Sequence, residues 1–139
     1  MLQRMVYSKF KLVTPDDKAL DQAPMVPYPF VPSSQFRIIT MIDEPATQVV
    51  YEDWFKGNDV EWVYWVDAFH FVVSGEAEIT YWNAPEWKET GTVTARAGDI
   101  YLTPRGSRVR WHITSDDPFR HIVLDIPNAG YDTGDLHKT

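Results

Sequence analysis

Nine short segments rich in β-branched and aromatic residues follow one another between residues 36 and 127. Turn-forming stretches such as DEPA and KGND separate them, and none has the length and periodicity of an ordinary helix. Short strands at regular spacing are typical of a β-sandwich or a β-barrel. The sequence therefore predicts an all-β fold, with strands over residues 36–42, 47–55, 60–66, 68–74, 75–83, 92–97, 99–104, 107–114 and 119–127.

The two ends of the chain depart from this pattern. Residues 1–35 include the stretch QAPMVPYPFVPSSQ, whose four prolines favour an extended segment over a helix. Its apolar residues indicate a Pro-rich N-terminal arm that packs on the barrel or on a partner subunit. Residues 128–139 are polar and are expected to form a loose C-terminal tail, which leaves residues 36–127 for the barrel.

Charge and composition exclude several classes of partner. The formal net charge of −7 argues against nucleic acid and against anionic membranes, because both need a basic surface. The chain has no cysteine, so disulfides and thiolate metal sites are absent. No run approaches the ~20 apolar residues of a membrane span. The first residues show no secretory h-region, so we expect a cytoplasmic protein.

Tryptophan is concentrated in one part of the sequence. Five of the six tryptophans lie between residues 54 and 87. They can belong to a sheet core and a dimer interface, or to an aromatic-walled pocket for a planar ligand or a sugar. The two interpretations are compatible, and the sequence leaves both open.

Two stretches, DAFHFVVSGEAEI and ARAGDIYLTPRGSRVRWHI, carry the most specific pattern in the chain. In the first, a strand ends at the glycine turn of Gly75. In the second, Gly98 and Asp99 precede a strand that leads to Pro104 and Gly106. Their order and spacing resemble the two motifs of the cupin superfamily over residues 36–127. The resemblance implies a double-stranded β-helix, the cupin jelly-roll barrel, which is often a homodimer.

Within the cupins, the chain most resembles the ethanolamine-utilisation protein Q family. Trp62 and Asp67 match residues that this family places before the glycine-ended strand, and the stretches GDIYLTPRGSRVRW and FRHIVLDIP are also similar. Val66 and Ala68 stand where that family has tyrosine and glutamate. The resemblance implies a setting in a catabolic operon without fixing a reaction.

The usual cupin metal ligands are missing from the matching positions. The histidine positions fall at Glu61, Val63 and Val109, and the glutamate position falls at Ala68. Valine and alanine cannot ligate a metal, so we expect no standard metal site and no cofactor. A displaced site would have to use residues from the set His70, Glu61, His112 and His121.

Strand alternation places His70 on an inward face. Residues two apart share a face of a strand, so Ala68, His70 and Val72 are predicted to point into the barrel. The alanine opens space beside His70, which favours a ligand there. The alternative is a core histidine bonded to a neighbouring carbonyl or hydroxyl, and both interpretations remain.

Several other residues are candidates for the same site. Glu61 takes a place that faces inward in cupins and could form an acid/base pair with His70, or it could be a solvated carboxylate. Tyr81 shares the parity of Ala77 and Ile79 and could donate a proton beside His70. The predicted substrate-binding residues are Trp62, Tyr64, Trp65, Trp111 and His121.

Two orientations are open for each of the last two strands. After Pro104, the alternation puts Val109 and Trp111 inside and Arg110 and His112 outside, although a β-bulge would reverse this. In the strand 119–127, His121, Val123 and Asp125 share one face, which lines the cavity or a subunit contact. The opposite face, with Ile122, Leu124 and Ile126, has the composition of a core.

Three functions fit these observations. The first is a small-molecule-binding cupin that works as a metal-independent acid/base enzyme, of lyase, isomerase or cyclase type. His70 would be its acid/base, with Glu61 and Tyr81 in support. The second is a non-catalytic accessory or binding protein of a catabolic operon, and the third is a metal-dependent, dioxygenase-like cupin with displaced ligands. The expected partners are a small-molecule substrate and a second copy of the chain.

Overall fold

The computed structural model describes residues 7–29 and 31–126 of the chain, so the predicted C-terminal tail lies outside the described residues. The predicted all-β fold is confirmed, and a strand lies in each of the nine predicted segments. The elements are α1 (Asp17–Asp21), β1 (Val26–Tyr28), β2 (Val31–Glu44), β3 (Thr47–Trp54), β4 (Asp59–Val63), β5 (Asp67–Ser74), β6 (Glu76–Trp82), β7 (Thr90–Arg96), β8 (Ile100–Thr103), β9 (Arg108–Ile113) and β10 (Phe119–Ile126).

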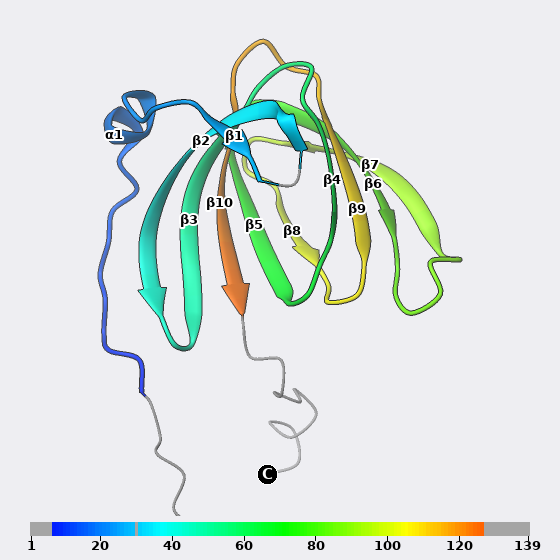
Figure 1. The fold of residues 1–139 in the computed structure, drawn as a ribbon, viewed down its shortest axis with the longest axis horizontal. Coiled ribbons are helices and arrows are strands. Elements are labelled where there is room, and N and C mark those ends of the chain that lie inside the picture. The colour runs from blue at the N-terminus through cyan, green and yellow to red at the C-terminus, as the bar shows by residue number, and fades with distance from the viewer. Residues whose placement is uncertain (1–6, 30, 127–139) are drawn as a thin grey trace, which may run out of the picture.

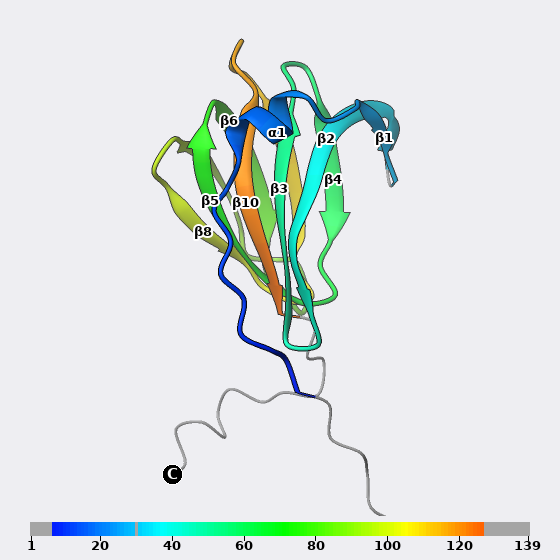
Figure 2. The same cartoon turned by 90° about the vertical axis from the view of Figure 1, so that its left-hand side faces the viewer.

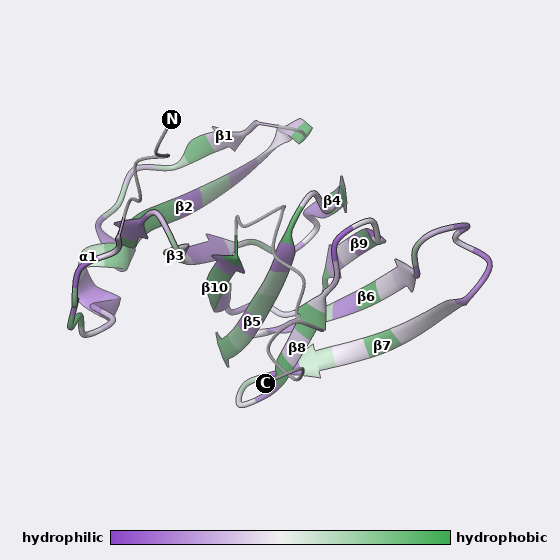
Figure 3. Cartoon of the chain, turned by 90° about the horizontal axis from the view of Figure 1, so that it is seen from below, coloured by the Kyte–Doolittle hydropathy of each residue, from purple (hydrophilic) through white to green (hydrophobic). Residues whose placement is uncertain are grey.

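Two antiparallel sheets face each other (Figure 1). One has six strands in the order β1-β2-β3-β10-β5-β8, and the other has four in the order β4-β9-β6-β7. Several neighbouring strands are distant in sequence, such as β3 and β10, β10 and β5, and β4 and β9, which is typical of a jelly roll. Seen from below, the two sheets enclose the interior between them (Figure 3).

The core lies between the sheets and is built from alternating residues. On β9, Val109, Trp111 and Ile113 are buried while Arg110 and His112 are exposed, as the alternation predicts. On β5, Ala68, His70 and Val72 are buried and point inward, again as predicted. The largest core cluster contains Phe36, Trp54, Val60, Val72, Ala77, Ile79, Ala95, Val109, Trp111, Ile113 and Phe119.

The segment before residue 36 is more ordered than an extended arm. β2 begins at Val31 instead of residue 36, and β1 pairs with it, so part of the predicted arm belongs to the six-stranded sheet. A short helix, α1, forms where Asp16 caps it by accepting a hydrogen bond from the amide of Ala19 at 3.0 Å. Figure 2 shows α1 beside β3 and β2. Within the described residues, no helix has the length and apolar character needed to cross a membrane.

A buried ion-pair network fastens α1 to the sheet. Asp53 on β3 has no exposed side-chain surface and accepts hydrogen bonds from both Arg120 on β10 and Arg37 on β2. Arg120 also pairs with Asp21 at the end of α1. One carboxylate on the outer side of the six-stranded sheet therefore joins three strands, and Arg120 extends the network to the helix.

Gly75 makes the turn between β5 and β6 possible. Its φ of +81° lies in the left-handed region, and a Cβ at this position would lie 2.4 Å from the carbonyl oxygen of Pro118. The glycine is therefore required both by its backbone conformation and by the close approach of the segment that leads into β10.

Candidate functional site

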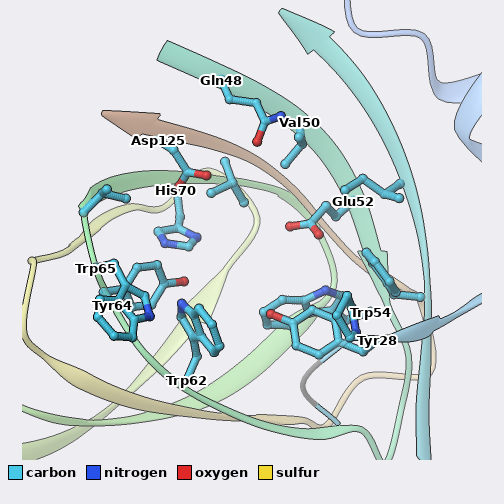
Figure 4. A pocket seen from close by; sticks show the side chains of 15 residues that line it. Tyr28, Gln48, Val50, Glu52, Trp54, Trp62, Tyr64, Trp65, His70 and Asp125 are labelled. Atoms are coloured by element: carbon cyan, nitrogen blue, oxygen red, sulfur yellow. The ribbon is translucent and has the colours of Figure 1, made fainter. Parts of the chain in front are cut away.

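A cavity of about 390 Å³ lies between the sheets, and we call it the main cavity. Figure 4 shows its labelled side chains pointing toward one another from β3, β5 and β10 on one side and from β1 and the β4–β5 connection on the other. It is lined by Tyr28, Pro29, Phe36, Ile38, Gln48, Val50, Glu52, Trp54, Trp62, Tyr64, Trp65, Val66, His70, Val123 and Asp125.

The strand register brings the polar lining residues together. Across β3, β10 and β5, Gln48 lies opposite Asp125, which lies opposite Ala68. The next inward row is Val50, Val123 and His70. In the third, Glu52 lies opposite His121. His70 and Asp125 are thus diagonal neighbours on one face, and the small side chain of Ala68 leaves room between them.

His70 is almost completely buried, at 1% exposure, and is hydrogen-bonded through one ring nitrogen. Its Nε2 lies 2.9 Å from the hydroxyl of Thr103, and that hydroxyl lies 3.3 Å from the carbonyl oxygen of Ala68. A carbonyl can only accept, so a Thr103 hydroxyl that donates to Ala68 is able to accept from His70 Nε2. This arrangement favours the tautomer with the lone pair on Nδ1. Burial, and then the neighbouring His121, holds the pKa of His70 well below its usual value, so the ring is neutral.

Three buried polar atoms around the cavity lack a hydrogen-bond partner among the described residues. They are Nδ1 of His70, Nδ1 of His121 and Nε1 of Trp54. The centroid of the His121 ring lies 4.6 Å from that of Trp54 and 6.1 Å from that of His70, so the three atoms lie in the same region of the core. Buried polar groups are normally paired, so unpaired groups concentrated at a cavity are a feature of ligand sites.

Two carboxyl groups line the same wall. Glu52 accepts a hydrogen bond from Nε2 of His121 at 3.2 Å and is 7% exposed. Asp125 is half-buried, and its pKa is raised first by burial and then by the charge of Glu52. The two carboxyls differ in environment, and such a difference separates an acid from a base in many active sites.

The opposite wall is aromatic. Trp62, Tyr64 and Trp65 extend from the end of β4 into its connection with β5, and Tyr28 and Trp54 close the other side (Figure 4). The Tyr28 and Trp54 rings meet edge to face at 5.8 Å. Trp62, Tyr64 and Trp65 thus line the same cavity as His70, and the Tyr64 ring lies 6.0 Å from the His70 ring.

Glu61 is not in this cavity, and the prediction that it faces inward is wrong. It is exposed on the outer side of β4 and pairs with Arg108 of β9. The reason is the register: Trp62 lies opposite the buried Val109, which puts the indole inside and the neighbouring carboxylate outside. Burying an indole is favourable, whereas burying an unpaired carboxylate is costly.

Tyr81 shares an inward face with Ala77 and Ile79, but it lies away from the main cavity. It lines a second cavity of about 200 Å³ together with Tyr101 and Thr103. Those two residues stand between it and His70, since Tyr101 stacks on the His70 ring at 4.4 Å and Thr103 bonds it. The geometry therefore does not pair Tyr81 with His70.

Trp111 and His121 lie behind the cavity wall instead of forming it. Both have no exposed surface, and neither is among the residues that line the main cavity. Trp111 donates its indole N–H to the Tyr101 hydroxyl at 3.0 Å and packs 6.0 Å from His70. His121 contacts the site through Glu52. Both residues support the lining side chains.

The two faces of β10 differ from the prediction. His121 and Val123 are the buried, inward residues, whereas Ile122 and Leu124, predicted as core, are only half-buried on the outer face.

Glu52 and Trp54 were not predicted at the site. Their alternation with Gln48 and Val50 on β3 was the available signal, because it puts all four on one face.

The residues at the cupin metal positions do not fit a metal. Glu61 points outward, and Ala68 and Val109 are buried side chains without a ligand atom. Among the described residues, no group of three His, Asp or Glu side chains is arranged to hold a metal ion. We therefore derive no chemical step through a metal.

Replacing Asp125 with Asn is expected to stabilise the fold at neutral pH. Because the folded state raises the pKa of Asp125, the folded protein binds a proton more tightly than the unfolded chain does. The contribution of this carboxyl to stability is therefore greatest in acid and falls as pH rises through the folded pKa. Urea unfolding should show a higher midpoint for Asp125→Asn than for the wild type at neutral pH. The gap between the two midpoints should narrow in mild acid. A gap that widens in mild acid would contradict the assignment.

No protein-family model matches the chain, and no curated protein matches it. Several solved structures match the chain. The EutQ protein of Clostridium difficile aligns over 69% of this chain and 65% of its own, with a TM-score of 0.54 and 19% identity. A cupin superfamily protein from Desulfitobacterium hafniense aligns over 66% and 77%, with a TM-score of 0.54 and 16% identity.

A third match is more distant in sequence. The cupin domain of Schizosaccharomyces pombe Cnp3 aligns over 74% of this chain and 66% of its own, with a TM-score of 0.57 and 12% identity. At these identities the likeness concerns the fold. Together with the two facing sheets and the glycine turns, it shows that the chain has the cupin fold.

Proposed function

We propose that this protein binds a small organic molecule in the main cavity and transfers a proton to and from it, as an isomerase or lyase does. The observation that carries this is one cavity wall bearing a neutral imidazole with an unpartnered nitrogen and a carboxyl of raised pKa. A neutral imidazole and a carboxyl whose pKa is raised can act as a base and an acid.

The roles follow from the protonation states. The Thr103 hydroxyl favours the proton on Nε2 of His70 and the lone pair on Nδ1, so we assign His70 the role of base. Asp125 acts as the acid, since its raised pKa lets it hold a proton. In an isomerisation, one proton leaves the substrate for His70 and another reaches it from Asp125, so the substrate keeps its atoms and charge. Solvent exchange then resets both groups.

Deuterium incorporation tests this without knowledge of the product. A small-metabolite library is screened by ligand-observed NMR, and each bound compound is then incubated with the protein in D₂O. The wild type should exchange a C–H hydrogen of the bound ligand. His70→Gln and Asp125→Asn should slow the exchange by about 10²–10⁴-fold, the usual contribution of a general acid or base.

The control is Glu61→Gln, a carboxyl outside the cavity, which should exchange at the wild-type rate. Binding by the wild type without exchange would overturn the proposal and favour the non-catalytic binding protein. Exchange that survives in both site variants would equally overturn it.

We further propose that the expected homodimer forms through the outer face of the six-stranded sheet. Phe69 and Phe71 of β5 lie opposite Leu102 and Ile100 of β8, and Ile100 is 68% exposed. Figure 3 shows both strands among the hydrophobic parts of the chain. Ile122 and Leu124 continue the two rows across β10. Contiguous exposed apolar surface of this kind commonly marks an interface.

Changing Ile100 to Glu is expected to weaken the dimer at least about tenfold, because a two-fold interface meets the new charge twice. Light scattering over a dilution series measures the dissociation constant. Thr94→Glu, on an exposed position of β7, is the control and should leave it unchanged. A wild type that is monomeric at every concentration would refute the interface.

A further inference from the structure

The charges around the main cavity are all of one sign. Its lining includes two carboxyl groups, Glu52 and Asp125, and contains no Lys or Arg. Two arginines of the same sheet, Arg37 and Arg120, form hydrogen bonds with Asp53 on its outer side. A ligand inside the cavity therefore meets negative charge without a compensating cation from the lining.

Glu52 is built into this wall. It is 7% exposed, and among the described residues its hydrogen-bond partner is His121, which contacts one oxygen. His121 is itself fully buried against Trp54 and Phe119. A carboxylate fixed in this way keeps its position when a ligand binds, and it retains capacity to accept further hydrogen bonds.

The aromatic wall faces these carboxyls. Tyr28, Trp54, Trp62, Tyr64 and Trp65 surround the same space from which Glu52 projects (Figure 4). Aromatic ring faces attract cations electrostatically, and the attraction is stronger when the pair is desolvated. An aromatic wall that faces the Glu52 carboxylate combines the two kinds of protein group that favour a positive charge.

Other ligand classes fit less well. A carboxylate or phosphate would lie against Glu52 and Asp125 with no Lys or Arg in the lining to neutralise it. A purely apolar ligand would bury the Asp125 carboxyl and the second oxygen of Glu52 without giving either a hydrogen bond, which is costly. The unpartnered Nδ1 of His70 adds a hydrogen-bond acceptor to the same region.

We propose that the main cavity binds a small organic cation, with an ammonium group held between Glu52 and the aromatic wall, next to Asp125. This deepens the function proposed above, because it names the class of substrate for the same cavity. It does not depend on proton transfer, since an unreactive ammonium ion should bind in the same way.

Three compounds of matched size separate charge from shape: n-butylammonium, butan-1-ol and butyrate. Isothermal titration calorimetry of the full chain at low salt should show n-butylammonium binding at least about tenfold more tightly than butan-1-ol. Butyrate should bind more weakly than either. Equal affinity for the three, or tighter binding of butyrate, would overturn the proposal.

The decisive variant is Glu52→Gln, which keeps the size of the side chain and an acceptor for His121 while removing the charge. It should weaken n-butylammonium at least about tenfold and leave butan-1-ol unchanged. Glu61→Gln, outside the cavity, is the matched control. If Glu52→Gln binds the ammonium ion as well as wild type does, the proposal fails.

The two proposals can fail separately. Ammonium binding without deuterium exchange in any bound ligand would refute proton transfer and leave the cation site intact. Exchange in neutral or anionic ligands, with no preference for n-butylammonium, would refute the cation site alone. Thermal unfolding of each variant checks that a lost heat of binding does not reflect a lost fold.

Discussion

Replacing Asp53 with Ala is expected to lower the free energy of unfolding by about 3–5 kcal/mol, the cost of leaving a buried charge without its partner. Asp53 has no exposed surface and receives Arg120 at 2.7 Å and Arg37 at 2.7 Å. Without the carboxylate, the Arg120 guanidinium, which is only 10% exposed, keeps Asp21 as its close partner. Asp53 positions both arginines that bond Asp21 on α1, namely Arg120 to its side chain and Arg37 to its backbone carbonyl, so the helix should also loosen.

Urea unfolding gives the free energy, and amide hydrogen exchange in residues 17–21 reports on α1. Asp59→Ala is the matched control, since Asp59 forms an exposed pair with Arg110 at 2.5 Å. An exposed pair contributes at most about 1 kcal/mol. Equal losses for the two variants would show that the Asp53 network is no more than another surface pair.

Replacing Gly75 with Ala is expected to cost about 2–4 kcal/mol, from a left-handed backbone and a steric clash together. The added methyl would meet the backbone of Pro118 and Phe119, at 2.4 and 2.8 Å, and backbone cannot rotate away as a flexible side chain can. The β5–β6 turn would have to separate from the start of β10, next to the rows that carry the cavity residues.

Gly98→Ala separates the two causes. Gly98 has a φ of +90°, similar to that of Gly75, but a Cβ there has open space around it. The Gly98→Ala variant should lose only the free energy of the backbone strain, about 1 kcal/mol. Thermal unfolding of both variants gives the difference, and a Gly98 variant as unstable as the Gly75 variant would remove the steric explanation.

The alternation of side chains explains why most of the fold was predictable. On β5 and β9 the inward residues are the ones that the period of two selects, so His70 and Trp111 are buried as expected. On β4 the comparison with cupin metal positions placed Glu61 inside, while the local pattern of Val60 and Trp62 favoured the opposite face. The local pattern was correct, because it reflects burial in this chain.

The candidate site was only half predictable, for a reason specific to sheets. Trp62, Tyr64 and Trp65 are close in sequence to His70, and their grouping was expected. Glu52 reaches the site only because β10 lies between β3 and β5, and that strand order is a long-range property. A single sequence shows which residues share a strand face but not which strands are neighbours.

The layer formed by Tyr101 and Thr103 limits how long a ligand can be. Both residues touch His70 on one side and line the second cavity on the other, so a single thickness of side chain separates the two spaces. The main cavity is thus closed at His70, and a ligand that enters it cannot extend farther into the barrel. A homologue with a small residue in place of Tyr101 would have a continuous channel and could accept a longer molecule.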